Sequence, residues 1–496
     1  MENKIYDYLI LGAGWGGVSL GALLAKEGKK VCVVEKNDRP CGYGYFKLGE
    51  YEFSPNALYI QGCREGWNVY EFIKELGLEK EITFNSLDED GYDRLILPNF
   101  SFNLPIGIEN ITHKLSSEFP DEDEKIEKFF EIMVKLDDEM DFFEKAPTIM
   151  NVLRRPHKNL CTIRYGWMTL QGLFNHLKMS HNLQNAIMGT TLVTDYAPDK
   201  LSVLVASAEY IGYASCHYPA KGIGHMIKTV EKFAKENGVT FVYNTEITAI
   251  SNTIDNSREI QTTSGTFRAN KVISNLDPQI TYKLLGKDAP RKYHYEYSPS
   301  AFLIFLGLTD RKKIMEAGFG KCNYYLTSTD DIHQAIKSMT DGLYDDFAIY
   351  IGTPSLVANE GEMSPTGKMG MQIIINGSFE KFNQMTPAEQ EKEKERISNK
   401  MIDFISKKFN IDLNELVEEK EIWSPVDFSK KANRPYGNIY GRSFSPKTLI
   451  FNQLSQETEF DDIFLCGANA TITGILGVIN GSLILRDKLL KIESEK

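Results

Sequence analysis

The feature of this sequence that most constrains its fold is a glycine-rich turn near its start, Gly12-Ala13-Gly14-Trp15-Gly16-Gly17. The apolar run 6–11 before the turn is typical of a buried strand, and residues 16–27 after it have the pattern of a helix. In a G-x-G-x-x-G turn the first glycine permits a tight bend, the second lets the backbone approach a pyrophosphate, and the third lets helix and strand pack closely. The turn therefore predicts a doubly wound α/β unit that binds a nucleotide.

A second predicted strand, residues 30–35, ends on the acid Glu35. A carboxylate at this position can accept hydrogen bonds from both ribose hydroxyls and disfavours a 2′-phosphate, so NADP is not expected here. The N-terminus of the intervening helix offers unpaired N–H groups and a partial positive charge to the phosphates. The fingerprint by itself does not separate NAD from FAD.

A further glycine-rich segment follows the predicted strand 463–466 and precedes the last helix. It contains Gly467-Ala468 and then Gly474-Ile475-Leu476-Gly477. A plain NAD dehydrogenase has no need for a second strand–turn–helix of this kind, whereas a flavin ring could sit at this helix N-terminus. An ordinary tight connection between strand and helix is the alternative.

Three separated segments carry this α/β character, and the stretches between them differ in pattern. Residues 108–210 are helix-rich and include the charge run 121–128, which we expect to be a solvated helix face. Residues 299–376 are rich in β patterns, and Thr386-Pro387-Ala388-Glu389 predicts the start of a charged surface helix. We therefore expect a nucleotide-binding domain assembled from three chain segments and an α+β substrate domain.

The expected boundaries follow from these patterns. The nucleotide-binding domain takes residues 1–85, 218–285 and 445–496, and the substrate domain takes 86–217 and 286–444.

Composition excludes several classes of partner and site. The net charge of −12 excludes nucleic acid, because a phosphate backbone needs a basic face. The seven cysteines are scattered and contain no C-x-x-C, and the eight histidines show no paired metal spacing, so we expect no metal and a reducing cytoplasm. No secretory signal is visible, and the apolar window 201–211 is too short to span a bilayer.

The three α/β segments together resemble the bacterial phytoene desaturase family, which also contains carotenoid cis–trans isomerases and retinol saturases. The resemblance spans nearly the whole chain. Besides the nucleotide fingerprint it rests on Tyr218-Pro219-Ala220-Lys221-Gly222-Ile223-Gly224, Ser274-Asn275-Leu276-Asp277-Pro278, Ser298-Pro299-Ser300-Ala301-Phe302 before Leu306-Gly307-Leu308, and Pro354-Ser355-Leu356 with Pro365-Thr366-Gly367-Lys368.

The resemblance implies a Rossmann-like fold of the two-dinucleotide-binding type, with FAD in an extended pose and no separate NAD(P) domain. It implies that the backbone of Ile247 meets the adenine and that the turn from Gly467 to Leu476 faces the flavin. The residues expected to bind FAD are Gly12, Gly14, Trp15, Gly16, Gly17, Glu35, Lys36, Gly42, Ile247, Gly467, Ala468, Gly474, Ile475 and Leu476.

Three stretches depart from the family pattern. Cys41-Gly42-Tyr43 stands where the family has Gly-Gly-Arg, and Phe53-Ser54-Pro55-Asn56-Ala57 stands where it has Phe-Asp-x-Gly-Pro. Leu476 replaces a usual proline. Because the family places these stretches close to the flavin, the departures leave the direction of the reaction open.

A flavin can desaturate a hydrocarbon, saturate it when reduced, or isomerise it without net transfer. The resemblance thus implies a polyene or isoprenoid substrate, which is bound through apolar area and is reached by peripheral contact with the inner face of the membrane. Gly222-Ile223-Gly224 lacks a third glycine, so electrons are expected to pass to or from quinone, oxygen or a redox protein. An amine oxidase and a non-enzymatic flavoprotein are the rival classes.

No catalytic acid or base is assigned firmly. Glu209 could carry a proton, with a solvated glutamate as the alternative, and His225 could approach the cofactor, with a packing or capping histidine as the alternative. Tyr43 and Tyr45 could wall the flavin or be half-buried strand residues. An apolar tunnel could be lined by Leu201, Val203, Leu204, Val205, Tyr210 and Ile211, for which plain helix core is the alternative.

Overall fold

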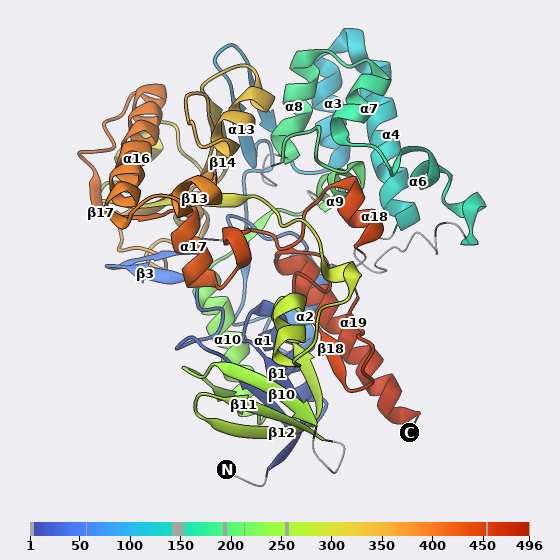
Figure 1. Ribbon diagram of the computed structural model, residues 1–496. Coiled ribbons are helices and arrows are strands. Elements are labelled where there is room, and N and C mark those ends of the chain that lie inside the picture. Colours follow the sequence, from blue (N-terminus) through green and yellow to red (C-terminus); the bar gives the residue numbers. More distant parts are fainter. Residues whose placement is uncertain are drawn as a thin grey trace.

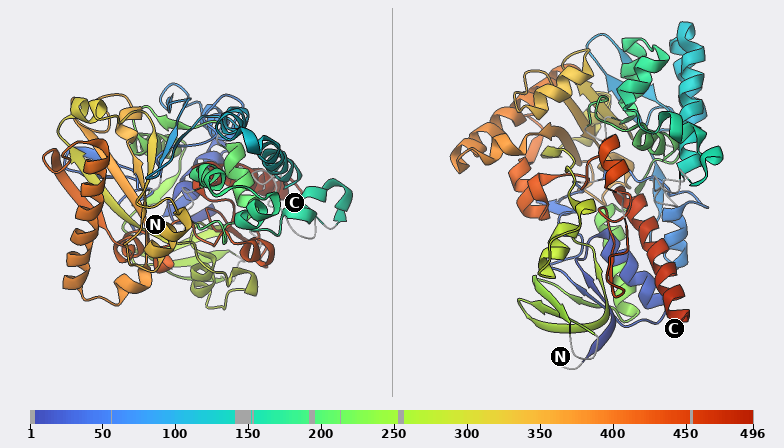
Figure 2. Two further views of the ribbon diagram at one scale, coloured as in Figure 1. Left: turned by 90° about the horizontal axis from the view of Figure 1, so that it is seen from above. Right: turned by 45° about the vertical axis from the view of Figure 1, so that its right-hand side comes forward.

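Two seven-stranded sheets lie at opposite ends of the part of the molecule that the structure, a computed structural model, describes (Figure 1). The described residues are 4–55, 57–140, 152, 154–191, 196–212, 214–252, 257–452 and 455–495. A group of helices lies beside the second sheet, and the long C-terminal helix runs along one side of the first (Figures 1 and 2).

The first sheet has the strand order β10-β11-β12-β1-β2-β9, with β18 paired to β12. β1 pairs in parallel with β2 and β12, whereas β10, β11 and β12 form an antiparallel extension. Its strands come from three distant stretches of the chain: β1 (Ile5–Leu11), β2 (Val31–Val34), β9 (Thr240–Val242), β10 (Ile247–Asn252), β11 (Arg258–Thr262), β12 (Gly265–Ser274) and β18 (Ile463–Leu465).

Helices cover this first sheet. The short runs β1 and β2 are apolar and almost entirely buried, as expected for parallel strands covered on both faces. α1 (Trp15–Lys26) packs against both α10 (Ile223–Glu236) and α19 (Gly474–Ser494). α2 (Asn68–Glu75) packs on α19, and α11 (Pro278–Leu284) follows β12.

The second sheet has the order β17-β13-β16-β15-β14-β6-β7 and is antiparallel except between β14 and β6. Every residue of β13 is buried, so this strand lies in the middle of the core. The strands are β6 (Asp93–Ile96), β7 (Ser101–Leu104), β13 (Ser300–Leu308), β14 (Asn323–Thr327), β15 (Ala348–Gly352), β16 (Met369–Gly377) and β17 (Val417–Trp423).

The helix-rich stretch predicted before residue 210 is confirmed. Within it α4 packs on α9, and the largely exposed charge run 121–128 covers the end of a short 3-10 turn (Pro120–Glu122) and the start of α4. The helices are α3 (Ile108–Glu118), α4 (Asp123–Met140), α6 (Leu160–Tyr165), α7 (Leu170–Leu177), α8 (His181–Thr191) and α9 (Val203–Gly212).

The long helix α16 (Pro387–Phe409) begins where its capping box predicts, because the Thr386 hydroxyl accepts from the Glu389 N–H and the Glu389 carboxylate accepts from the Thr386 N–H. The shorter strands and α-helices are β3 (Phe46–Leu48), β4 (Tyr51–Phe53), β5 (Phe84–Ser86), β8 (His217–Pro219), α12 (Arg311–Glu316), α13 (Ile332–Thr340), α14 (Pro354–Val357), α15 (Phe379–Asn383), α17 (Pro425–Ala432) and α18 (Pro446–Phe451).

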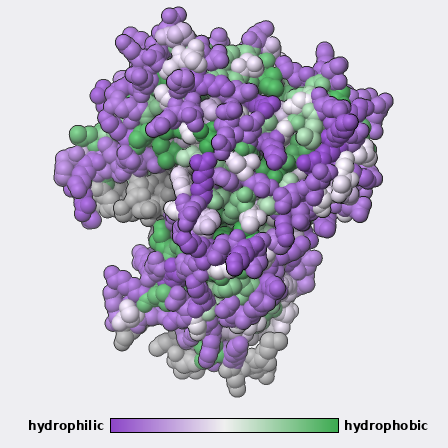
Figure 3. All heavy atoms as spheres, turned by 180° about the vertical axis from the view of Figure 1, so that it is seen from behind, coloured by the Kyte–Doolittle hydropathy of each residue, from purple (hydrophilic) through white to green (hydrophobic). Residues whose placement is uncertain are grey.

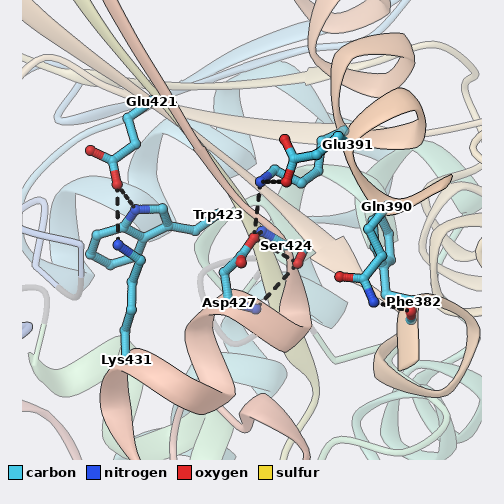
Figure 4. Close-up of polar contacts among 9 residues, drawn as sticks. Phe382, Gln390, Glu391, Glu421, Trp423, Ser424, Asp427 and Lys431 are labelled. Atoms are coloured by element: carbon cyan, nitrogen blue, oxygen red, sulfur yellow. Dashed lines mark hydrogen bonds and ion pairs between the residues drawn. The ribbon is translucent and has the colours of Figure 1, made fainter. Parts of the chain in front are cut away.

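Polar contacts fix α17 at the end of β17 (Figure 4). The Ser424 hydroxyl accepts from the Asp427 N–H at 3.2 Å, and the Asp427 carboxylate accepts from the Ser424 N–H at 2.9 Å. Lys394 of α16 lies 3.2 Å from the same carboxylate and holds the two helices together. This cap positions Phe428, one turn into α17, as part of a cavity wall that is described below.

Candidate functional site

The first glycine turn joins β1 to α1 through backbone that only glycine tolerates. Gly12 has a φ of 91°, in the left-handed region. A Cβ on Gly17 would lie 2.1 Å from the Gly12 carbonyl oxygen, and one on Gly14 would lie 2.6 Å from the Asn275 side-chain nitrogen. No side chain caps the N-terminus of α1, and its first turn has no acid. The helix end is therefore left open to an anion.

Glu35 follows β2 and is held in a fixed orientation. Its carboxylate accepts from the Ala13 N–H at 2.7 Å, from the Asn37 N–H at 2.9 Å and from the Asn37 side-chain amide at 2.7 Å. A carboxylate has further lone pairs, so Glu35 can still accept hydrogen bonds from ligand hydroxyls.

The second glycine turn lies between β18 and α19. Gly467 has a φ of 81° and Gly474 a φ of 82°. A Cβ on Gly474 would meet no atom within 4 Å, so the start of α19 faces open space. No side chain caps this helix either, with Thr473 at the N-cap and no acid in the first turn.

Asn275, directly after β12, lies between the two turns. Its amide nitrogen is 3.4 Å from the Gly12 carbonyl, and a Cβ on Gly467 would lie 2.2 Å from its amide oxygen. The sequence placed Asn275 in a family motif but not among the site residues. The pattern asparagine-x-aspartate directly after a predicted strand could have indicated Asn275 as a site residue, and Asp277 of the same pattern lines the same cavity.

One cavity runs between the two turns. Of the fourteen residues that the sequence predicts as FAD ligands, those on its wall are Gly12, Gly14, Trp15, Gly16, Glu35, Lys36, Gly42, Ile247, Gly467, Ala468, Gly474 and Ile475. Gly17 is in contact with Gly12 instead, and Leu476 lies on the wall of a neighbouring cavity. Two uncapped helix ends and a fixed carboxylate in one cavity fit the phosphates and ribose of a dinucleotide.

Part of the wall of this cavity is polar. The Asp277 carboxylate accepts from the Asn469 amide at 2.9 Å and from the Tyr295 and Tyr297 hydroxyls at 3.4 and 3.3 Å. Burial raises the pKa of Asp277 above its ordinary value, although these hydrogen bonds oppose the shift.

A second, largely apolar cavity adjoins the first at the C-terminal glycine turn. The residues that line both are Ile439, Tyr440, Ala468, Thr473, Gly474 and Ile475. Its remaining walls come from distant segments and include Leu58, Tyr59, Ile60, Val205, Ala208, Ala301, Leu303, Ile374, Phe428, Phe444, Leu449 and Leu476. The cavity therefore offers an apolar ligand a place beside the turn at the start of α19.

Glu209 lies on the wall of this apolar cavity, on α9. Burial raises the pKa of its carboxyl to about 7, and a hydrogen bond from the Gln61 side chain opposes the shift. A carboxyl of this kind can both hold and release a proton near neutral pH. By its solvent exposure Glu209 is half-buried, so it is neither a freely solvated glutamate nor one sealed from water.

The other sequence candidates lie elsewhere. His225 is on α10, where its ring Nε2 lies 3.1 Å from the Glu81 carbonyl, and it is on the wall of neither cavity. Tyr43 lines the dinucleotide cavity, whereas Tyr45 packs beneath Arg39 and Lys228. Asn56 lies outside the described residues.

Of the six tunnel candidates, Val205 is on the wall of the apolar cavity. The five others are not among its lining residues. Val203, Leu204 and Tyr210 are buried in α9, as the alternative of plain helix core has it, whereas Leu201 is buried before the helix and Ile211 is half-buried. Within the described ranges, no three or more His, Cys, Asp or Glu side chains are grouped so that they could hold a metal ion.

Comparisons with known proteins agree with this geometry. Residues 10–76 match the family model "NAD(P)-binding Rossmann-like domain". The chain is 22% identical to a chloroplastic prolycopene isomerase of Daucus carota over 90% of this chain and 74% of the relative. It is also 22% identical to an all-trans-retinol 13,14-reductase of Danio rerio (96% and 84%) and to a 1-hydroxycarotenoid 3,4-desaturase of a Flavobacterium (89% and 90%).

Solved structures share the fold at lower identity. An oxidoreductase from Methanosarcina mazei superposes with a TM-score of 0.64 at 14% identity, covering 97% of this chain and 99% of the other. Cyclohexylamine oxidase from Brevibacterium oxydans gives 0.61 at 12% identity, with coverage of 98% and 100%. Together these findings confirm the resemblance that the motifs indicate: the chain is an oxidoreductase with a Rossmann-like fold for a flavin or dinucleotide cofactor, similar over most of its length to carotenoid and retinoid enzymes.

Proposed function

We propose that this chain binds FAD and carries out redox chemistry at a carbon–carbon bond of a long apolar polyene or isoprenoid. The observation that carries the proposal is the meeting of the two cavities at Ala468, Thr473, Gly474 and Ile475. One cavity fits a dinucleotide and the other an apolar chain, and the two share the turn that faces the flavin in the family that the chain resembles.

Residues of both turns would hold the cofactor. The open N-termini of α1 and α19 stabilise negative charge, and Glu35 accepts from the ribose hydroxyls. Bound FAD would supply hydride uptake or hydride donation. The division into an FAD-binding domain (1–85, 218–285, 445–496) and a substrate domain (86–217, 286–444) belongs to this proposal.

The apolar cavity would bind substrate through buried area, which contributes about 25 cal/mol per Å². Its aliphatic and aromatic walls exclude water from the reacting carbons. Glu209 is the group that we expect to exchange a proton with a substrate carbon, because it is the carboxyl on this wall and its pKa lies near 7.

Desaturation is the favoured direction, with cis–trans isomerisation or saturation as the alternative. The departures at Cys41-Gly42-Tyr43 and Phe53-Ser54-Pro55 keep this choice open. An amine-oxidase-like activity is the second alternative, favoured by the fold shared with cyclohexylamine oxidase. Quinone, oxygen or a redox protein is the proposed electron partner, since the chain carries no second complete nucleotide fingerprint.

The cofactor assignment is tested by acid denaturation of the purified protein. We expect FAD in the supernatant. Release of NAD, release of FMN, or no released nucleotide would contradict the assignment.

A small surface suits peripheral contact with a membrane. Leu160, Ile163 and Trp167, on and just after α6, are 66%, 39% and 52% exposed. Exposed basic residues flank them: Arg154, Arg155, Lys158 and Arg164. This pairing of apolar and cationic side chains fits an anionic lipid surface. Seen from behind, the molecule is mostly polar and its apolar patches are small and separate (Figure 3).

Within the described ranges, every helix is too short or too polar to cross a bilayer. Membrane contact is therefore tested at the α6 surface, by sedimentation with phosphatidylserine-containing vesicles. Trp167→Ser should weaken binding about 10-fold, since it removes roughly 1.5 kcal/mol of apolar burial. Leu343→Ser is the matched control, because Leu343 is 53% exposed but is flanked by Asp341, Asp345 and Asp346. Equal binding by both variants would contradict this placement.

A further inference from the structure

The apolar cavity contains a buried cation that forms no ion pair with an acidic side chain in the described part of the chain. Arg442 lies on its wall and is only 7% exposed. Its guanidinium donates to the Asn452 carbonyl at 2.5 Å, and no ion pair joins it to any carboxylate of the described residues. Burial lowers the pKa of Arg442 to about 10, so the group stays charged at neutral pH.

The two other buried arginines of the described chain are paired. Arg258 is 8% exposed and makes a two-pronged ion pair with Asp462, at 2.5 and 2.8 Å. Arg486 is 9% exposed and pairs with Glu75 and Asp487. A buried charge without a partner is costly, so Arg442, the one of the three with no acidic partner among the described residues, is the one that calls for a bound anion.

We propose that Arg442 binds a carboxylate at the end of an otherwise apolar substrate, so that the substrate class is a polyene or isoprenoid acid. The inference rests on the proposed function, because it assigns the substrate of that same cavity. A planar guanidinium presents several N–H donors in a fork that matches a carboxylate.

The charge balance of the cavity selects a carboxylate over a phosphate. Arg442 is the only Lys or Arg on the wall of this cavity among the described residues. A carboxylate carries one negative charge and is neutralised by one guanidinium, whereas a phosphate ester carries more at neutral pH. Glu209, on the same wall, adds little opposing charge below its pKa of about 7. The same cation repels an ammonium group, which disfavours a simple amine substrate.

The test compares retinoic acid with retinol, which share a polyene and differ in the end group. Binding to the purified holoprotein is followed by quenching of protein fluorescence and by perturbation of the visible flavin band. We expect retinoic acid to bind about 10-fold to 100-fold more tightly than retinol, as for a hydrogen bond to a charged group.

Variants separate the role of charge from that of packing. Arg442→Gln should remove the preference for the acid, and Arg442→Lys should keep part of it. Arg258→Gln is the matched control and should keep all of it. Without ligand, Arg442→Gln should melt no lower than the wild type, whereas Arg258→Gln should melt lower because it leaves Asp462 unpaired.

Three results would overturn the assignment. Equal affinity for acid and alcohol in the wild type would show that the cavity reads no carboxylate. Equal weakening of both ligands in Arg442→Gln would give Arg442 a packing role only. Failure of both retinoids to bind would contradict the proposed function itself, together with this inference.

Discussion

The dinucleotide cavity and the apolar cavity adjoin, but they are built in different ways. The first is shaped by backbone: glycines at tight approaches, two open helix ends and one fixed carboxylate. The second is shaped by side chains from β13, α9, α17 and the loops around residues 58 and 444. The part that holds a cofactor common to many enzymes is thus local, whereas the part that selects the substrate depends on the tertiary fold.

We expect the greatest loss of function from a substitution in the dinucleotide cavity. In Gly14→Ala the new Cβ would lie 2.6 Å from the Asn275 amide, so the turn or Asn275 must move. We expect FAD affinity to fall at least about 100-fold, or roughly 2.7 kcal/mol, and all activity to fall with it. Titration of the apoprotein with FAD measures the effect.

Gly320→Ala is the matched control, because its Cβ would meet nothing closer than 3.9 Å and Gly320 lines neither cavity. Normal FAD affinity in Gly14→Ala would contradict the inference that close-packed glycine backbone shapes the dinucleotide cavity.

A second substitution distinguishes the chemical step from ligand binding in the apolar cavity. Glu209→Gln keeps the shape of the side chain and its contact with Gln61 but cannot exchange a proton. Turnover should fall about 10²-fold to 10⁴-fold, with cofactor and ligand affinities within about threefold of the wild type. The wild-type rate should also depend on a group with a pKa near 7. Unchanged turnover would mean that the proton moves through another group.

A smaller effect concerns stability beneath the apolar cavity. Asp93 of β6 is fully buried and accepts from the Asn323 amide at 2.9 Å and from the hydroxyl of Tyr350, a wall residue, at 3.2 Å. Its other carboxylate oxygen has no hydrogen-bond partner among the described residues. Burial raises the pKa of Asp93 from 3.8 to about 7.

Between the two pKa values, 3.8 and about 7, Asp93 is largely protonated in the folded chain and largely ionised in the unfolded chain. The stabilisation is therefore complete below about pH 4 and is lost as the pH rises through about 7. Asp93→Asn removes this loss, so at about pH 8 the variant should be more stable than the wild type by about 2–4 kcal/mol. Urea unfolding at about pH 5 and pH 8 measures it, and an equal difference at both pH values would contradict the cause.

We expect the least effect from a substitution at His225, outside both cavities. His225, on α10, contacts the Glu81 carbonyl and lines neither cavity. We expect His225→Gln to change turnover and FAD affinity less than about twofold, as for a surface substitution. A large loss of turnover with normal folding would show that His225 contributes to catalysis.

Features that depend on local spacing could be predicted from the sequence. The turn around Gly14, the carboxylate of Glu35 and the capping box at Thr386 each depend on residues close together in the chain, and each lies where expected. The sequence alone does not show which side chains of residues 201–211 face the apolar cavity, because this depends on the packing of α9 on α4. Arg442 carries no sequence signal, since its burial and its lack of an acidic partner arise only in the tertiary fold.

We propose that a flavin bound by this protein acts on an apolar polyene. The most direct measurement incubates purified protein anaerobically, oxidised and chemically reduced in parallel, with apolar lipids extracted from its host, and follows polyene masses. We expect a polyene that loses two hydrogens with oxidised protein, gains two with reduced protein, or changes double-bond geometry at constant mass with reduced protein. If no polyene changes under either condition while an amine reduces the flavin, the claim is contradicted.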